Sequence, residues 1–247
     1  MAKKEDLRLQ RLGTVINQTS SRQEKALVLA LANVSRMLEE KFPGIRLKLE
    51  TQWFLSTVVS NLRERFPEAE FHYYHERSSM RPDGGILSIL DTEDKAYPIL
   101  IAEKKNQGTN NLRAAEGKTK QAKGNAIERL GKNVIGFRTA LMGESIFPFV
   151  CFGDGCDFED GSTILDRVTT IAMFGKLNHE HLHNTGLKGI FDRGTFYFRE
   201  KEWDEAEMTD KCYSIAEKSV FYYYSKHGED SFVNPKNPQA NHQSKLL

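Results

Sequence analysis

The chain has 247 residues and a formal net charge of +1 at pH 7, so its overall charge indicates no polyanionic partner, and any such binding must come from local clusters. This length suffices for one sizeable core, and no apolar run approaches the roughly 18 residues that a membrane span needs. Three cysteines cannot form a fully paired disulfide framework, and no apolar segment follows the first six residues, so we expect a cytoplasmic protein without a secretory signal.

Two amphipathic helices are predicted in the N-terminal part. Residues 1–20 are polar and weakly periodic, and we expect an N-terminal arm that ends in a helix cap. From residue 22 to 41, leucines and a valine recur at helical spacing until Pro43 and Gly44 end the pattern. A second helix is predicted over 51–66, with Pro67 beyond its end.

The hydrophobic period then changes from that of a helix to that of strands. Strands are predicted at 70–76, 86–90 and 97–104, and the turn-like segment between the last two indicates a hairpin. Pro98 cannot donate a ladder hydrogen bond, so we expect it at the start of its strand or on an edge.

Helices and strands alternate in the rest of the chain. A polar loop or arm with some helix is expected at 106–123, a helix from Asn125, a strand at 147–152, and a helix from Ser162 to about Gly175. A strand at 191–198, a helix at 210–226 and a flexible tail at 234–247 follow. The order predicts an α/β fold with a central mixed β-sheet flanked by helices, formed by a single domain over 1–233.

Two carboxylates and a lysine mark the most informative stretch. Side chains two apart in a strand share a face, so Glu103 and Lys105 point to one side of the sheet and Lys104 to the other. Asp83 precedes the first hairpin strand, and an antiparallel return would bring it beside Glu103, giving two oxygen ligands for Mg²⁺. The alternative is structural, since an aspartate after proline often makes a turn and Glu-x-Lys often lies on a solvated face.

Basic residues cluster directly after this pair of strands. Between residues 103 and 133 there are eight basic residues and three acids, which predicts a DNA-contacting surface or, alternatively, a solvated face. The candidate DNA contacts in and near this cluster are Arg81, Lys104, Arg113, Lys118, Lys120 and Lys123.

The start of the helix at Asn125 carries polar groups suited to base recognition. The N-terminal residues of a helix can reach base edges in a major groove, where asparagine pairs with adenine and arginine with guanine. The candidates are Asn125, Ala126, Glu128 and Arg129. The alternative is that Asn125 and Glu128 only cap the helix and Arg129 forms a surface ion pair.

Three sequence words in the same order resemble the type II restriction endonucleases related to EcoRI, within the PD-(D/E)xK nuclease superfamily. They are Ser78–Ile86 with Arg-Pro-Asp-Gly-Gly, Ala102–Gly108 with Ala-Glu-Lys-Lys-Asn-Gln-Gly, and Gly124–Arg129 with Gly-Asn-Ala-Ile-Glu-Arg. Weaker similarity continues to Glu202 and Trp203, so it covers most of the chain after residue 70.

This resemblance implies a restriction-endonuclease-like fold and a prokaryotic homodimer that cuts a DNA palindrome with Mg²⁺, leaving 5′ overhangs and 5′-phosphates beside a partner DNA methyltransferase. Asp83 and Glu103 would bind the metal and Lys105 would be the catalytic lysine. Glu50 falls near the place of a further acidic residue, although a role at the start of the next helix fits as well. The word at 124–129 implies an AATT core. Arg167 matches one of two recognition arginines, but Ile164 replaces the other, which leaves the outer base pair undefined.

Two other functions remain open from the residues alone. One is a DNA-repair or mobile-element nuclease of the same superfamily that recognises DNA structure, and the other is a DNA-binding protein without activity. The histidines at 179, 181 and 183 alternate as zinc ligands on a strand would, but a polar loop explains them more simply. Cys151 is predicted to be a small core residue.

Overall fold

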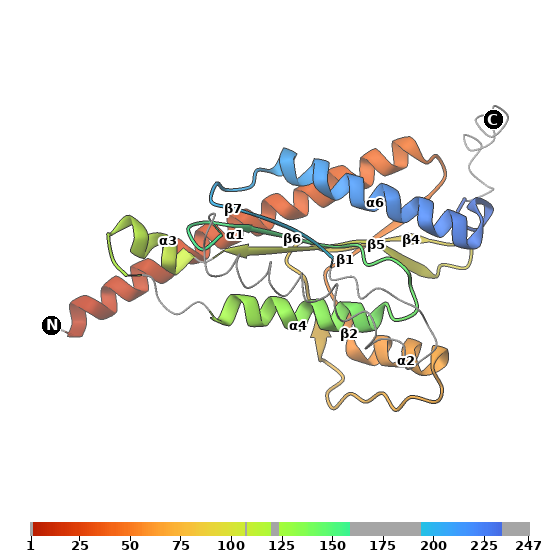
Figure 1. Ribbon diagram of the computed structural model, residues 1–247, viewed down its shortest axis with the longest axis horizontal. Coiled ribbons are helices and arrows are strands. Elements are labelled where there is room, and N and C mark those ends of the chain that lie inside the picture. Colours follow the sequence, from red (N-terminus) through yellow and green to blue (C-terminus); the bar gives the residue numbers. More distant parts are fainter. Residues whose placement is uncertain (1, 107, 120–123, 159–193, 234–247) are drawn as a thin grey trace, which may run out of the picture.

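A computed structural model describes residues 2–106, 108–119, 124–158 and 194–233, and for 2–17, 19, 108–109, 112 and 124–129 it describes the backbone alone. A five-stranded mixed sheet forms the centre of the molecule (Figure 1). Its strands, in spatial order, are β1 (Arg46–Glu50), β4 (Gly85–Leu90), β5 (Ala96–Asn106), β6 (Phe149–Asp154) and β7 (Thr195–Arg199). The first three strands pair antiparallel, whereas β5, β6 and β7 are parallel.

Two long helices cover one face of the sheet. α1 (Ala2–Lys41) and α6 (Glu205–His227) lie side by side there, and the N-terminal part of α1 extends beyond the sheet edge (Figure 1). A capping box between Asp204 and Glu207 begins α6, and the short 3-10 helix η2 (Glu229–Ser231) follows it. The buried residues of α1 and α6, among them Leu31, Val34 and Val220, pack on Leu100 and Phe152 of the sheet.

A different set of elements covers the opposite face. α4 (Gly124–Ala140) packs there, and α2 (Leu55–Arg65) lies outside it with the small ladder of β2 (Trp53–Phe54) and β3 (Ser79–Met80). The inward stripe of α4 begins at Leu130 and includes Val134 and Phe137, which meet Ile101 and Phe149 of the sheet. α3 (Gly108–Ala115) follows β5 and contacts α1.

The predicted class and most central elements are confirmed. The hairpin of β4 and β5, the helix over 124–140, the strand at β6, the strand at β7 and the helix at α6 are all present, with ends that differ by a few residues. Pro98 lies near the start of β5, ahead of Ile101 where pairing with β6 begins, so its missing N–H interrupts no bond to β6. No helix among the described residues is long and apolar enough to cross a membrane.

Three expected boundaries are wrong. α1 is continuous from Ala2, so no helix begins after residue 21, and contacts with α3, distant in sequence, support its N-terminal half. The second helix begins at Leu55, because Trp53 and Phe54 pair with β3 instead. Residues 70–76 form no strand; the backbone oxygen of Phe71 accepts hydrogen bonds from Arg63 rather than from a neighbouring strand.

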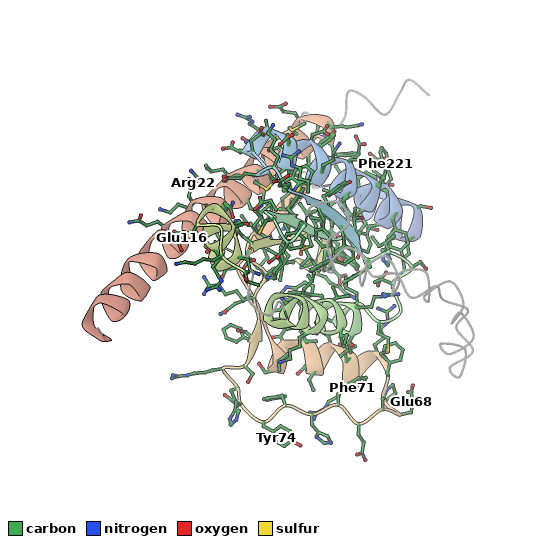
Figure 2. All side chains as sticks on the ribbon, turned by 60° about the vertical axis from the view of Figure 1, so that its left-hand side comes forward. Arg22, Glu68, Phe71, Tyr74, Glu116 and Phe221 are labelled. Carbon is green, nitrogen blue, oxygen red and sulfur yellow. The ribbon has the colours of Figure 1, made fainter. Side chains whose placement is uncertain are left out.

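Tyr74 in this loop points outward. Figure 2 shows Tyr74 on the loop beyond α2, pointing away from the body, and its exposed fraction is 92%. The helix expected from Ser162 to Gly175, the histidines at 179–183 and the tail at 234–247 lie outside the described residues.

Candidate active site

The end of β5 positions the predicted catalytic groups. Glu103 and Lys105 lie two apart on the face of the sheet that α4 covers, as the strand alternation requires. The antiparallel return of β4 pairs Gly85 with Ala102, and the N–H of Gly84 donates to the Ala102 oxygen at 2.9 Å. Asp83 is therefore held directly beside Glu103, as the sequence predicted.

Hydrogen bonds connect these three residues to one another. The backbone N–H of Asp83 donates to Oε2 of Glu103 at 3.1 Å, while Oδ2 of Asp83 accepts from the Lys105 ammonium at 3.3 Å. Lys105 also donates to Oε1 of Glu103. The lysine thus bridges the two carboxylates, which marks the position as favourable for positive charge.

Burial and neighbouring charge shift the pKa values of these groups. Burial raises the pKa of Glu103, whose side chain is only 1% exposed, and the nearby Asp83 carboxylate acts in the same direction. Burial alone would lower the pKa of Lys105, but Glu103 and Asp83 outweigh it and raise that pKa. The lysine therefore stays an ammonium group at neutral pH.

Gly84 and Gly85 follow Asp83 directly and shape the start of β4. A Cβ at Gly84 would lie 2.6 Å from Cγ of Leu27, a fully buried residue of α1, and 3.1 Å from Cβ of Ala102. Gly85 has a φ of +101°, a conformation that other residues rarely adopt. Gly84 thus lets α1 and the strand approach each other closely, whereas Gly85 supplies the backbone conformation at the start of β4.

A cleft of about 220 Å³ opens between this site and α1. Its lining includes Ser20, Gln23 and Glu24 of α1 together with Asp83 and Lys105. Burial raises the pKa of Glu24, and the negative charge of Asp83 raises it further. Sequence reasoning missed these α1 residues, because nothing in a helical pattern indicates which turn faces a distant site.

A second missed residue comes from α4. Nδ2 of Asn133 donates to Oε1 of Glu103 at 2.8 Å. Its position offers a signal, because Asn133 lies one turn after Leu130 and one turn before Phe137, on the apolar stripe. A polar residue in such a stripe indicates a partner across the interface.

The opposite face of β5 carries a buried polar network. Lys104 pairs with Asp154 at the end of β6, and both side chains are 3% exposed. Asp154 also accepts from Asn106 at 3.1 Å, from Gln23 at 3.4 Å and from the backbone N–H of Trp203 at 3.2 Å. Lys104 was expected to contact DNA. Its side chain lines the cleft, but its ammonium group pairs with Asp154 and is nearly enclosed, so we assign it to this network and not to the proposed DNA contacts.

The structure describes the surroundings of three of the other basic candidates. Arg81 is exposed, Arg113 donates to the Thr119 backbone oxygen at 2.6 Å, and Lys118 pairs with Glu116 at 2.8 Å. Lys120, Lys123 and Arg167 lie outside the described residues. Asn125, Ala126, Glu128 and Arg129 occupy the first turns of α4, where only the backbone is described.

Glu50 lies on the same face of the sheet but not within the cluster. It ends β1 opposite Ile86, whose side chain belongs to the α4 side of the core, and its carboxylate pairs with Lys48 at 3.0 Å. Its backbone oxygen lies 3.0 Å from the position of a Cβ on Gly85.

The site offers two carboxylates to a cation. Within the described ranges, no three or more His, Cys, Asp or Glu side chains are grouped to hold a metal ion. Asp83 and Glu103 supply the hard oxygen donors that Mg²⁺ prefers, and the ion usually keeps several waters and takes further oxygens from a substrate phosphate. The donor set therefore fits Mg²⁺ bound together with substrate.

Comparisons with known proteins identify the family of this chain. The family model described as restriction endonuclease EcoRI matches residues 10–163. The type II restriction enzyme RsrI of Cereibacter sphaeroides is 29% identical over 222 residues, covering 76% of this chain and 80% of that protein. The type II restriction enzyme EcoRI of Escherichia coli is 29% identical over 184 residues, covering 69% of this chain and 64% of that protein. The chain thus belongs to the EcoRI family of type II restriction endonucleases, enzymes that cut double-stranded DNA at specific sites.

Proposed function

We propose that this protein hydrolyses phosphodiester bonds with Mg²⁺ at a short palindrome containing AATT, leaving 5′ overhangs and 5′-phosphates. The observation that carries this proposal is the convergence of Asp83, Glu103 and Lys105 beside the cleft. The names of both relatives support the reaction class.

Each of the three residues has a separate task. Asp83 and Glu103 would hold the ion, which would supply charge neutralisation at the phosphate and make a water more acidic. Lys105 donates hydrogen bonds to the attacking water and to the phosphate oxygens, which offsets the negative charge that develops there. Attack of the water oxygen on phosphorus breaks the bond to the 3′ oxygen, so the products are a 3′-hydroxyl and a 5′-phosphate. Glu50, on the neighbouring strand, is the candidate for a third carboxylate.

DNA contacts are assigned to two groups of residues. Arg81, Arg113 and Lys118 bind backbone phosphates, together with Lys120 and Lys123 of the segment 106–123, which acts as a loop or arm that clamps the DNA. Asn125, Ala126, Glu128 and Arg129 read the inner AATT from the first turns of α4, and Arg167 reads an outer position.

Two partners follow from the proposed reaction. One chain carries one set of catalytic residues, so cutting both strands of a palindrome calls for a homodimer whose symmetry matches the DNA. A host genome contains many copies of a short site, so a DNA methyltransferase that modifies this site is the expected companion.

Digestion of several plasmids with Mg²⁺, followed by sequencing of the cleaved ends, tests the proposal. We expect discrete bands that share one palindrome, and cutting that stops in EDTA and in Glu103→Gln. The matched control is Glu93→Gln, which changes an exposed glutamate in the hairpin turn and should cut normally. A smear, or nicks only, would favour the structure-specific repair nuclease. Cutting by Glu103→Gln at the wild-type rate would refute the assigned site.

A further inference from the structure

Asn133 connects two layers of the protein at the catalytic carboxylate. Its Nδ2 donates to Oε1 of Glu103 at 2.8 Å, although the two residues are 30 positions apart. Asn133 is half-buried and lies on α4, whereas Glu103 lies on the sheet that α4 covers. The contact is therefore part of how α4 is seated on the sheet.

An asparagine is an unfavourable choice at this position unless the hydrogen bond matters. Its neighbours one turn away, Leu130 and Phe137, are both buried in the apolar core beneath α4. Asparagine is a weaker helix former than leucine or alanine, and enclosing its amide costs free energy unless the amide is bonded. The bond to Glu103 supplies that compensation.

Asn133 differs from the other donors to Glu103 in where it comes from. Oε2 accepts from the N–H of Asp83 and Oε1 also accepts from Lys105, and both belong to the hairpin that carries Glu103 itself. Those two bonds survive any movement of the hairpin as a unit. The bond from Asn133 survives only when α4 and the sheet keep their relative position.

α4 also carries the segment assigned to DNA reading. The helix begins at Gly124, and Asn133 lies about 12 Å further along the axis than Asn125, on the same continuous helix. We propose that Asn133 is a positioning residue that couples the placement of α4 on DNA to the orientation of the Glu103 carboxylate. This inference rests on the proposed function, because it assumes that Glu103 serves the reaction and that α4 meets the bases.

Two substitutions test whether the hydrogen bond that Asn133 donates, rather than the size of its side chain, matters. Asn133→Ala removes the side-chain amide, whereas Asn133→Asp keeps its size but replaces the donor with an oxygen that repels Glu103. Ile135→Ala, at an exposed position on the same helix, is the matched control. For each protein we would measure the thermal midpoint, the DNA dissociation constant without divalent metal, the Mn²⁺ dissociation constant by calorimetry, and the single-turnover cleavage rate.

Cleavage is measured on the duplex site mapped from the plasmid ends and on a duplex with one inner base pair changed. Both Asn133 variants should lose about 10- to 100-fold in rate on the mapped site with nearly unchanged DNA affinity. Asn133→Ala should also bind Mn²⁺ about 10-fold more weakly, with a nearly unchanged thermal midpoint. The rate on the changed duplex should fall less, so that discrimination between the two drops by about 10-fold.

The outcomes distinguish this inference from the function beneath it. If the wild type cuts and Asn133→Ala cuts equally fast, or loses the same factor on both duplexes, the coupling is refuted while the endonuclease assignment stands. If Asn133→Asp matches the wild type, donation is not what matters and the inference also fails. If the wild type cuts no DNA, the proposed function fails and this inference fails with it.

Discussion

The two faces of β5 place adjacent lysines in opposite circumstances. On the α4 side, Lys105 bridges two carboxylates at a cleft, and Asp83 keeps 29% of its side chain exposed. On the α1 and α6 side, Lys104 pairs with the single carboxylate of Asp154, and both side chains are almost fully enclosed. We call the Lys105 side of β5 the reactive face, because the proposed chemistry uses it, and the Lys104 side the holding face.

The shifts in lysine pKa express the same difference. Burial lowers the pKa of Lys104, and the attraction of Asp154 does not offset it, whereas at Lys105 two carboxylates outweigh burial and raise the pKa. A site for phosphate chemistry needs a lysine that stays protonated and lies close to solvent. In a structural ion pair, the two partners need only bind each other, so the pair can be buried between the sheet and the helices.

The largest expected effect is a loss of cleavage activity without a loss of stability. Asp83→Asn should lower the cleavage rate by at least about 10²- to 10³-fold, because the proposed metal ligand loses its charge. Unfolding in denaturant should change little, or the variant should gain stability, since Asp83 no longer repels Glu103. A clear loss of stability in Asp83→Asn would show that the reactive face also holds the fold.

The holding face should respond in the opposite way. Asp154→Ala leaves the Lys104 ammonium buried without its partner, and we expect a loss of about 3 to 5 kcal/mol in the free energy of unfolding. The double variant Lys104→Met with Asp154→Asn keeps an acceptor for Trp203 and should recover at least half of that loss. Equal destabilisation in single and double variants would contradict a role for the charge pair.

Asn106 stands where the two faces meet. It lines the cleft beside Lys105, yet its amide donates to Gln23 at 2.9 Å and to Asp154 at 3.1 Å. Asn106→Ala should therefore destabilise the protein by about 1 to 2 kcal/mol and lower the cleavage rate less than Asp83→Asn does. The paired measurement is denaturant unfolding with single-turnover cleavage, and a rate loss as large as that of Asp83→Asn would move Asn106 to the reactive face.

The smallest expected effect concerns the pH dependence of stability and the loop after β7, in which the backbone N–H of Trp203 donates to Asp154. Arg199 lies 3.6 Å from the Trp203 ring centre, and its hydrogen bond to Glu207 lowers the pKa of that carboxyl from 4.5 to about 2. Glu207 therefore contributes stability above its unfolded pKa, and this contribution is lost as pH falls from about 4.5 through about 2.

Stability measured between pH 7 and pH 2 checks this contribution. Glu207→Gln should lose less stability on acidification than the wild type, whereas Glu40→Gln, at an exposed position on α1, should follow the wild type. A wild-type slope in Glu207→Gln would mean that other groups determine the acid limb.

The sequence predicted the reactive face because every step was local. Strand alternation relates Glu103 to Lys105, and a hairpin of short turn returns Asp83 beside them. Alternation also placed Lys104 on the other face of the sheet. The network that encloses its ammonium group there includes Asp154 and Gln23, which lie 50 or more residues away in the sequence. The role of Lys104 was therefore beyond local patterns.

The same distinction explains the errors at element ends. The polar run at 17–21 has the composition of a cap, but tertiary contacts extend α1 through it. The aromatic segment at 70–76 has strand-like composition, yet no neighbouring strand pairs with it, and Arg63 supplies its backbone partner instead. Propensity describes a segment, whereas pairing needs a second segment.

The close approach at Gly84 also has an evolutionary consequence. Any side chain there meets Leu27, which is fully buried and has no free space to occupy, so α1 would be pushed away from the strand. Gln23 and Glu24 would move with it, opening both the cleft and the network around Asp154. A side chain at position 84 thus requires a smaller residue at position 27, and a relative that lacks glycine at 84 should carry a residue smaller than leucine at 27.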